Sequence, residues 1–133
     1  MRKLSNYLEQ GRLSDVLALI QVLALGEHTH RSEKGLVADL QGQPSSSTTW
    51  SEIAKEHPEF FRFNPAEDKT HQISLISRHI LPGDDDKVTP EYTEKLLRLA
   101  IELHDRQMKR SEEWKVWVPT LTSIAAAIIA LCK

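Results

Sequence analysis

The residues of this sequence that could bind a metal are histidines and acids in two short segments. His28 and His30 stand two residues apart, and the nearby acids are Glu27 and Glu33. Imidazole and carboxylate groups are common ligands of transition metals, but a His-x-His pair in a loop is more typical of a solvated turn. Residues 84–86 are all aspartate and could attract Ca²⁺, yet they lack the ligand spacing and terminal Glu of a calcium loop. We therefore expect no metal site and no cofactor.

The residue patterns that mark common enzyme classes are missing from the sequence. It has no glycine-rich phosphate loop, no nucleophile turn built around a serine, and no His-Glu zinc motif. Cys132 is the single cysteine, which excludes an internal disulfide and a zinc site built from several cysteines of one chain. His57 precedes Pro58, and we interpret it as a helix-end residue that interacts with the helix dipole. We predict that the chain is not an enzyme and has no catalytic residues.

Length and charge narrow the class of protein. The chain has 133 residues and a formal net charge of −2, with acids and bases spread over both halves. A strongly basic nucleic-acid binder or an acidic disordered tail would need a one-sided charge balance. The apolar content is ordinary for a globular protein, so the sequence predicts one domain with an appendage. The lone cysteine favours the cytosol for the polar part.

The first 81 residues are predicted to fold as three helices followed by a β-hairpin. Ser14 is the expected N-cap of a largely apolar, buried first helix, and Thr49 stands at capping-box spacing from Glu52. The third helix should end near His57, because the residue before a proline is biased away from helix. Two segments with alternating apolar residues, separated by turn residues, predict the hairpin. The expected elements are helices over residues 14–26, 32–42 and 49–57 and strands over residues 60–63 and 72–77.

This order of elements resembles a winged-helix (winged helix-turn-helix) domain over about residues 12–81. The residues that carry the resemblance are Thr49-Trp50-Ser51-Glu52-Ile53-Ala54 and His57-Pro58-Glu59-Phe60-Phe61-Arg62, which are similar to the third helix and first wing strand of some members of that family. In such domains the third helix often enters the major groove of DNA. Here that helix would present two acids, Glu52 and Glu56, and one base, Lys55, and acids repel phosphates. The resemblance therefore implies a fold, and DNA binding is not expected from it.

Residues 82–89 are predicted to be a linker, and residues 90–115 a stalk helix. Thr89, Pro90 and Glu91 provide a cap, a first-turn proline and an acid near the positive end of the helix. An apolar stripe with spacings of four, three and four follows; its residues are Tyr92, Leu96, Leu99 and Leu103. The stripe can form a dimer interface or pack back on the domain, and both alternatives stay open.

Residues 116–132 carry no charge and are predicted to form a transmembrane helix. These 17 residues would span about 25 Å as a helix, the short end of the range for a bilayer. Lys115 and Lys133 bracket the segment, and the basic residues before it predict a single-pass protein with a cytoplasmic N-terminal domain. The expected anchor residues are Trp114, Trp117, Ile124, Ile128, Ile129 and Leu131. The alternative is a buried helix in a soluble oligomer.

Small residues in the same segment predict a contact between helices. Small side chains four residues apart let two helices approach closely. The residues with this spacing are Ser123, Ala126, Ala127 and Ala130. We expect self-association through this face.

These patterns favour a mainly helical, membrane-tethered protein-interaction or adaptor module that presents a winged-helix-like domain and self-associates. The expected partners are a membrane and a protein or second copy, but not nucleic acid. One alternative is a winged-helix transcription regulator that binds DNA as a dimer, for which the phosphate contacts would be Arg31, Lys34, Lys55 and Arg62. Another alternative is a small membrane-active effector, in which many tails assemble.

Overall fold

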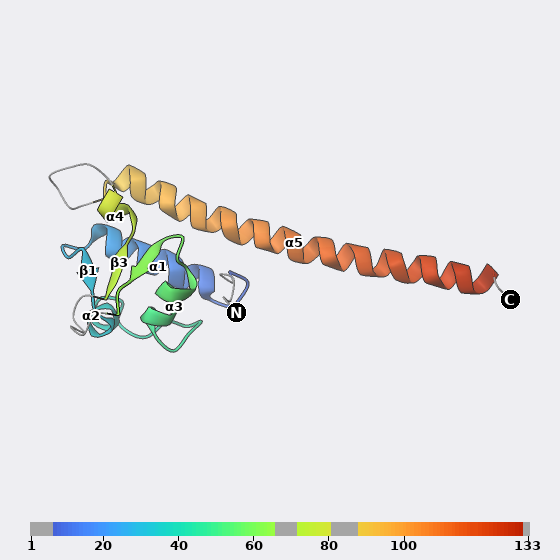
Figure 1. Cartoon of the computed structure of the whole chain (residues 1–133), viewed down its shortest axis with the longest axis horizontal. Helices are drawn as coiled ribbons and strands as arrows, with labels where there is room; N and C mark the ends of the chain where they lie inside the picture. The colour runs from blue at the N-terminus through green and yellow to red at the C-terminus, as the bar shows by residue number, and fades with distance from the viewer. Residues whose placement is uncertain (1–6, 66–71, 81–87, 132–133) are drawn as a thin grey trace.

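The computed structural model describes residues 7–65, 72–80 and 88–131, without the side chains of Ile80 and of residues 113–127. In this part of the chain, a mainly helical domain with a small sheet carries one long helix that extends far beyond it (Figure 1). The helices are α1 (Arg12–Leu25), α2 (Glu33–Asp39), α3 (Trp50–Glu56), α4 (Ser77–Ile80) and α5 (Pro90–Leu131). The strands are β1 (His30–Arg31), β2 (Phe61–Phe63) and β3 (Ile73–Leu75).

The strands form an antiparallel sheet in the order β1-β3-β2. The hairpin of β2 and β3 is confirmed, with Phe61 opposite Leu75. The sequence did not predict β1, which pairs His30 with Ser74 along the other edge of β3. A strand of two residues is too short to show the alternation by which strands are recognised. The small sheet therefore has three strands where the sequence predicted two.

α1 is the central helix of the core, as its nearly all-round apolar sequence predicted. It packs against α5 on one side and against β3 and α3 on another. The buried apolar residues of α1 are Val16, Leu19, Ile20, Leu23 and Ala24. Other parts of the domain contribute Leu36, Trp50, Ile53, Phe60, Phe61, Ile73, Leu75 and Ala100. The core therefore brings together residues from both ends of the domain sequence.

The helix ends show which local predictions were correct. Thr49 Oγ1 accepts a hydrogen bond of 3.2 Å from the Glu52 backbone N–H, so the predicted cap of α3 is confirmed. The predicted cap of α1 at Ser14 is wrong, because the helix begins at Arg12. Gly11 precedes it with a φ of 80°, a left-handed conformation that glycine adopts without steric cost. The chain can therefore turn into α1 one residue before Arg12, and Ser14 lies inside the helix.

Charged side chains from distant elements complete two other helix ends. Glu33 of α2 accepts hydrogen bonds of 2.8 Å from the backbone N–H groups of Trp50 and Ser51, at the start of α3. Arg78 of α4 donates to the carbonyl oxygens of Leu23 and Gly26 at 2.9 and 3.0 Å, at the end of α1. These groups have no partners inside their own helices, so both contacts satisfy backbone atoms that burial would otherwise leave unpaired. They also fix α3 to α2 and α4 to α1.

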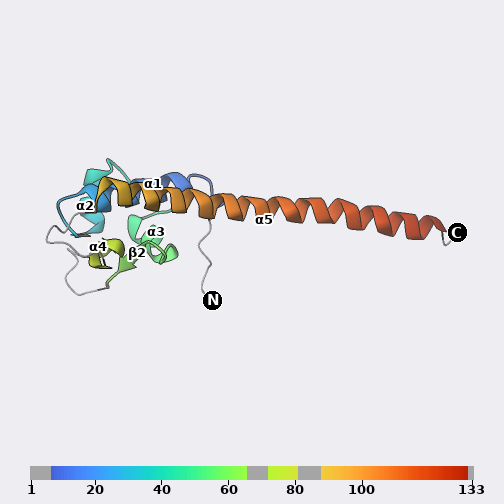
Figure 2. The same cartoon turned by 90° about the horizontal axis from the view of Figure 1, so that it is seen from above.

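The segments expected as a separate stalk and tail form one continuous helix, α5. Its start is as predicted, because Thr89 Oγ1 accepts a hydrogen bond of 3.2 Å from the Tyr92 N–H. The first part of α5 runs alongside the domain, and the rest extends away from it with none of the other described helices and strands beside it (Figures 1 and 2). The direction of the extended part is therefore set by how the first part packs.

The prediction of a transmembrane helix is wrong. Within residues 7–65, 72–80 and 88–131, no helix combines the length and the apolar character that crossing a bilayer requires. The apolar side chains of the uncharged tail are diluted by four alanines and three hydroxyl residues, and the preceding turns of α5 are highly charged. The single-pass membrane location falls with this prediction. So does the anchoring role of Trp114, Trp117, Ile124, Ile128, Ile129 and Leu131.

Two substitutions on opposite sides of α1 test the assignment of the core. Ile20 is fully buried and Leu25 is 60% exposed. We expect Ile20→Ala to lower the free energy of unfolding by about 2–5 kcal/mol, because it removes buried methyl groups and leaves a cavity. Leu25→Ala should change it by no more than about 0.5 kcal/mol. Urea unfolding of both variants measures this, and equal effects would contradict the packing described for α1.

Candidate functional site

The most unusual surface of the protein is the part of α5 that leaves the domain. Gln107 is a point of contact, since its Oε1 accepts a hydrogen bond of 2.8 Å from the backbone N–H of Tyr7. We call residues 108–131, which follow it, the projecting segment. Met108, Ile128, Ile129 and Leu131 are exposed there, Ile128 to 56% and Leu131 to 85%. Large apolar side chains gathered on one surface element typically mark a binding site.

A repeat of mostly apolar positions, which we call the stripe, runs along both halves of α5 and is interrupted between them by Gln107 and Arg110. In the half that packs on the domain, Ala100 and Thr93 are buried, and Leu96 and Leu103 lie against the core. The sequence continues this alternation of three- and four-residue steps into the projecting segment. The positions of the complete stripe are Thr93, Leu96, Ala100, Leu103, Gln107, Arg110, Trp114, Trp117, Leu121, Ile124, Ile128 and Leu131. Such a seven-residue repeat is the pattern by which helices pair in coiled coils.

The predicted helix-contact residues fall into two groups. Tyr92, Leu96 and Leu103 pack against the core of their own chain, whereas Leu99 is 42% exposed. Packing back on the domain, one of the two alternatives for this stripe, therefore describes three of its four residues. Of the small residues of the tail, Ala130 is exposed; the side chains of Ser123, Ala126 and Ala127 lie outside the described part.

The structure does not bring the four candidate nucleic-acid residues to one surface. Arg31 pairs across the sheet with Ile73, whereas Arg62 pairs with Ser74, so the two arginines point to opposite faces. Arg31 also forms an ion pair with Asp39. Lys55 lies 3.8 Å from a Glu52 carboxylate oxygen and 4.5 Å from the centre of the Phe63 ring. Lys34 is exposed on α2. DNA binding requires cations that face one groove, and this arrangement does not provide them.

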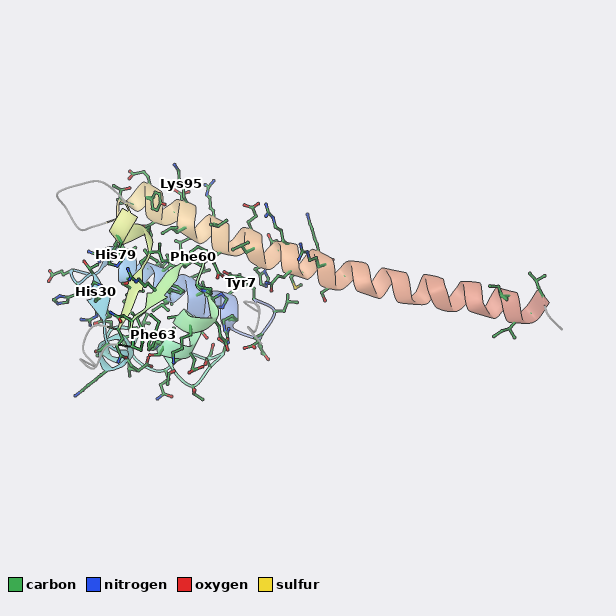
Figure 3. All side chains as sticks on the ribbon, viewed as in Figure 1. Tyr7, His30, Phe60, Phe63, His79 and Lys95 are labelled. Atoms are coloured by element: carbon green, nitrogen blue, oxygen red, sulfur yellow. The ribbon has the colours of Figure 1, made fainter. Side chains whose placement is uncertain are left out.

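The histidines that could suggest a metal do not form a metal site with nearby acids in the part of the chain that the structure describes. His30 and His79 are neighbours, with ring centres 5.2 Å apart (Figure 3). His79 Nε2 lies 3.1 Å from Ser74 Oγ. In the described part of the chain, no three His, Cys, Asp or Glu side chains gather closely enough to hold a metal ion. The aspartates at 84–86 lie outside that part.

Two surface grooves of the domain lack the features of a catalytic pocket. One, of about 540 Å³, lies at the end of α1 beside Leu25 and His28. The other, of about 500 Å³, lies between α3 and β2 and is lined by Ala54, Lys55, Pro58, Phe61, Phe63 and Pro65. Neither set of lining residues contains a serine, threonine or cysteine, the hydroxyl and thiol side chains that most acyl-transfer sites use as nucleophiles. The grooves are open surface features.

A buried polar cluster around Arg12 joins α1 to α3. The Arg12 side chain is 1% exposed and donates to Glu9 at 2.7 Å and to Glu56 at 2.5 Å. Its Nε donates to Ser46 Oγ at 2.9 Å, and Ser46 in turn donates to Asp15. A buried guanidinium is tolerated only when its donors are satisfied and its charge is balanced, and these partners do both.

His57 connects this cluster to residues 7–11, which precede α1 and which we call the N-terminal segment. Its Nε2 lies 3.3 Å from Arg12 Nη1, and because a guanidinium only donates, Nε2 is the acceptor. Nδ1 then donates to Glu59 Oε1 at 3.0 Å. The Tyr7 hydroxyl donates to the same oxygen, and the Tyr7 and His57 ring centres are 4.6 Å apart. His57 is fully buried, so its imidazole is closed to a substrate.

The protonation of this cluster follows from its contacts. Burial, the hydrogen bond to Glu59 and the negative charge of Glu59 all raise the pKa of Tyr7. Burial alone would raise the pKa of Glu59, but hydrogen bonds from His57 and Tyr7 outweigh it and lower that pKa. A negative Glu59 and a neutral Tyr7 hydroxyl therefore stabilise each other. The arrangement fits a structural clasp for the N-terminal segment.

Sequence reasoning missed this cluster almost completely. It interpreted His57 as a helix-end residue, and His57 is indeed the C-cap of α3. It gave no role to Tyr7, Arg12 or Glu59. The available signal was slight: His57 stands between the acids Glu56 and Glu59 in the sequence.

Removal of the Arg12 side chain should be strongly destabilising. Arg12→Ala leaves buried acceptors and an unbalanced Glu56 carboxylate, so we expect a loss of about 3–5 kcal/mol in the free energy of unfolding. Arg98→Ala is the matched control, because Arg98 is 76% exposed in its ion pair with Glu94. The control should lose less than about 1 kcal/mol. Chemical denaturation of the two variants measures both free energies of unfolding. A small decrease for Arg12→Ala would mean that the cluster does not stabilise the fold.

The pKa of Glu59 predicts an acid dependence of stability. Because this pKa is lower in the folded state than in the unfolded state, the contribution of Glu59 is complete above about pH 4.5 and is lost as the pH falls through the folded-state value. We expect Glu59→Gln to be less stable than the wild type at pH 7, with a difference that shrinks toward pH 3. Unfolding midpoints at pH 7, 5, 4 and 3 test this. A difference that stays constant with pH would exclude the charged form of Glu59 as the stabilising species.

Comparison with known proteins does not assign the chain to a family. No protein family, no curated protein and no solved structure matches it. Its function is therefore inferred from its own surfaces, of which the projecting segment of α5 is the most distinctive.

Proposed function

We propose that this protein is a protein-interaction module, in which a small domain displays the projecting segment of α5 as a helical docking element. The observation that carries the proposal is that the apolar stripe resumes in the same repeat beyond Arg110. Its first half packs against α1, whereas its second half lies where, among the helices and strands that the structure describes, no other element runs alongside α5 (Figures 1 and 2).

The energetics of a lone helix support this proposal. An isolated helix is marginal in water, because its stability in proteins comes mostly from packing of an apolar face. Ile128 and Leu131 are exposed on the projecting segment. Complete burial of one such side chain would contribute about 1.5–3 kcal/mol. A partner that covers several of them would therefore stabilise both the helix and the complex.

The domain supports an interaction role more than a DNA-binding role. We keep the winged-helix-like arrangement as a proposal for the domain, in which α1, β1, α2 and α3 precede the β2–β3 hairpin, and such folds do not determine function. The basic residues that a DNA-binding regulator would need lie on different faces or are paired with acids. We therefore favour a protein partner, and a binding role without catalysis.

Site-specific photo-crosslinking tests this function. A photoreactive benzophenone amino acid is placed at position 128 of the full chain, in the cells that produce the protein naturally. We expect a discrete covalent adduct with one protein or with a second copy, because Ile128 lies on the stripe of the projecting segment. The same amino acid at position 98, exposed on the half of α5 that packs on the domain, is the control.

The comparison of the two positions gives a clear outcome. A discrete adduct at position 128 with none at position 98 supports docking through the projecting segment. The proposal is wrong if position 128 gives no adduct, or if both positions give the same diffuse products.

A further inference from the structure

We infer that the partner of the projecting segment is a second copy of this chain, paired with it antiparallel over residues 114–131. The inference rests on the proposed function and names the partner, its direction and its register. It is carried by three observations: the residue types along the stripe, the absence of charge around it, and the packing of α1 on the first half of α5.

The charge pattern identifies the chemistry of the partner. No residue from Val116 to Cys132 is charged. The positions that flank the stripe, which in many coiled coils carry the ion pairs that select a partner, are therefore neutral here. A suitable partner must offer an equally uncharged apolar helix, and the same segment of a second copy does so. Two identical segments related by a two-fold axis are self-complementary.

The sizes of the residues favour an antiparallel register. In that register the stripe positions pair as Trp114 with Leu131, Trp117 with Ile128, and Leu121 with Ile124. Each tryptophan position then faces an aliphatic position, which alternates large and medium side chains through the interface. A parallel register would place each tryptophan position opposite its own copy, with four indoles in adjacent layers at one end.

The domain also favours the antiparallel arrangement. α1 packs on α5 near Leu96, Ala100 and Leu103, so each domain lies close beside its own α5. Paired helices are about 8–10 Å apart, whereas one helix with its side chains is about 10–12 Å wide. In a parallel pair, both domains would lie at the same level beside two helices that are this close together. They would then compete for the space around the same stretch of the pair.

The antiparallel pair avoids this conflict. Position 131 of one chain lies opposite position 114 of the other, which is seven residues beyond Gln107 and its contact with Tyr7. Seven helical residues correspond to about 10 Å, so the end of the partner segment stops short of the domain. The two Gln107 positions would be separated along the axis by about 45 Å. The pair would therefore hold two domains at opposite ends of a short helical rod.

Cysteine cross-linking tests the direction of the pair with the purified full chain. In the antiparallel register position 131 lies about 5 Å along the axis from position 111 of the other chain, whereas the two positions 131 are about 25 Å apart. In a Cys132→Ser background, we expect a short bis-maleimide to link chains that carry both Ser111→Cys and Leu131→Cys into covalent dimers of twice 15.2 kDa. Chains that carry Leu131→Cys alone in this background should remain unlinked. Glu94→Cys in place of Ser111→Cys, exposed on the half of α5 that packs on the domain, is the matched control and should also give no link.

A distance measurement makes the result independent of cross-linking efficiency. A spin label at position 109, introduced as Lys109→Cys with Cys132→Ser, should report a separation of about 40 Å in the antiparallel pair, set by 27 helical residues. A separation below about 20 Å would indicate a parallel pair, in which equal positions lie side by side. Light scattering on the same samples gives the mass of the species measured.

The possible results separate the two proposals. A dimer in which the Leu131→Cys chains are linked to each other, or which has a short label distance, overturns the antiparallel pair and leaves the interaction function intact. A monomer by light scattering, together with a photo-adduct of another protein at position 128, also overturns the second copy but keeps the function. A monomer with no photo-adduct overturns both.

Discussion

The packing of α1 along the first half of α5 is the contact on which the rest of the structure depends. Ala100 is fully buried in it, and Leu96 and Leu103 lie against the same core. Because α1 also packs on β3 and α3, this contact fixes the direction in which α5 leaves the domain. α1 is 14 residues long and α5 is 42, so α1 can run alongside only part of the apolar stripe. The length of α5 beyond α1 is therefore what turns a core contact into a candidate interface.

The buried polar cluster complements this apolar contact by fixing the chain that surrounds α1. Arg12 lies in the first turn of α1, and its partners come from the segment before it, from the loop at Ser46, and from α3 at Glu56. Glu59 then binds Tyr7, and the Tyr7 backbone reaches α5 at Gln107. Such a network is stable only when every polar group in it has a hydrogen-bond partner. In surroundings of low dielectric constant each hydrogen bond is stronger, and a missing hydrogen bond costs more free energy. It specifies how the N-terminal segment lies between α3 and α5, which the apolar core alone would not determine.

The sequence predicted the features that depend on near neighbours. The caps at Thr49 and Thr89, the apolar character of α1 and the β2–β3 hairpin were all recognisable within a few residues. The Arg12 cluster was not, because its partners Ser46 and His57 are 34 and 45 residues away and nothing near Arg12 marks it as buried. The tail was wrongly predicted to cross a membrane because its 17 uncharged residues were considered as a separate segment, whereas they belong to the same helix as the charged residues before them. A helix that faces lipid on all sides does not need its apolar residues on one face, so the transmembrane prediction did not include the repeat that the tail shares with Leu96 and Leu103.

The polar residues in the middle of the stripe explain why it has two separate halves. Gln107 and Arg110 occupy stripe positions between Leu103 and Trp114. Gln107 accepts a hydrogen bond from the Tyr7 backbone, so the half of the stripe that packs on the domain ends at Gln107. Burial of Arg110 against an uncharged partner would cost far more than it gains, because a charge is buried favourably only with a paired and hydrogen-bonded partner. The contact with a paired helix therefore ends before Arg110, and the pairing is limited to residues 114–131. Arg110 fixes the register of the pair in the way that single polar positions do in coiled coils.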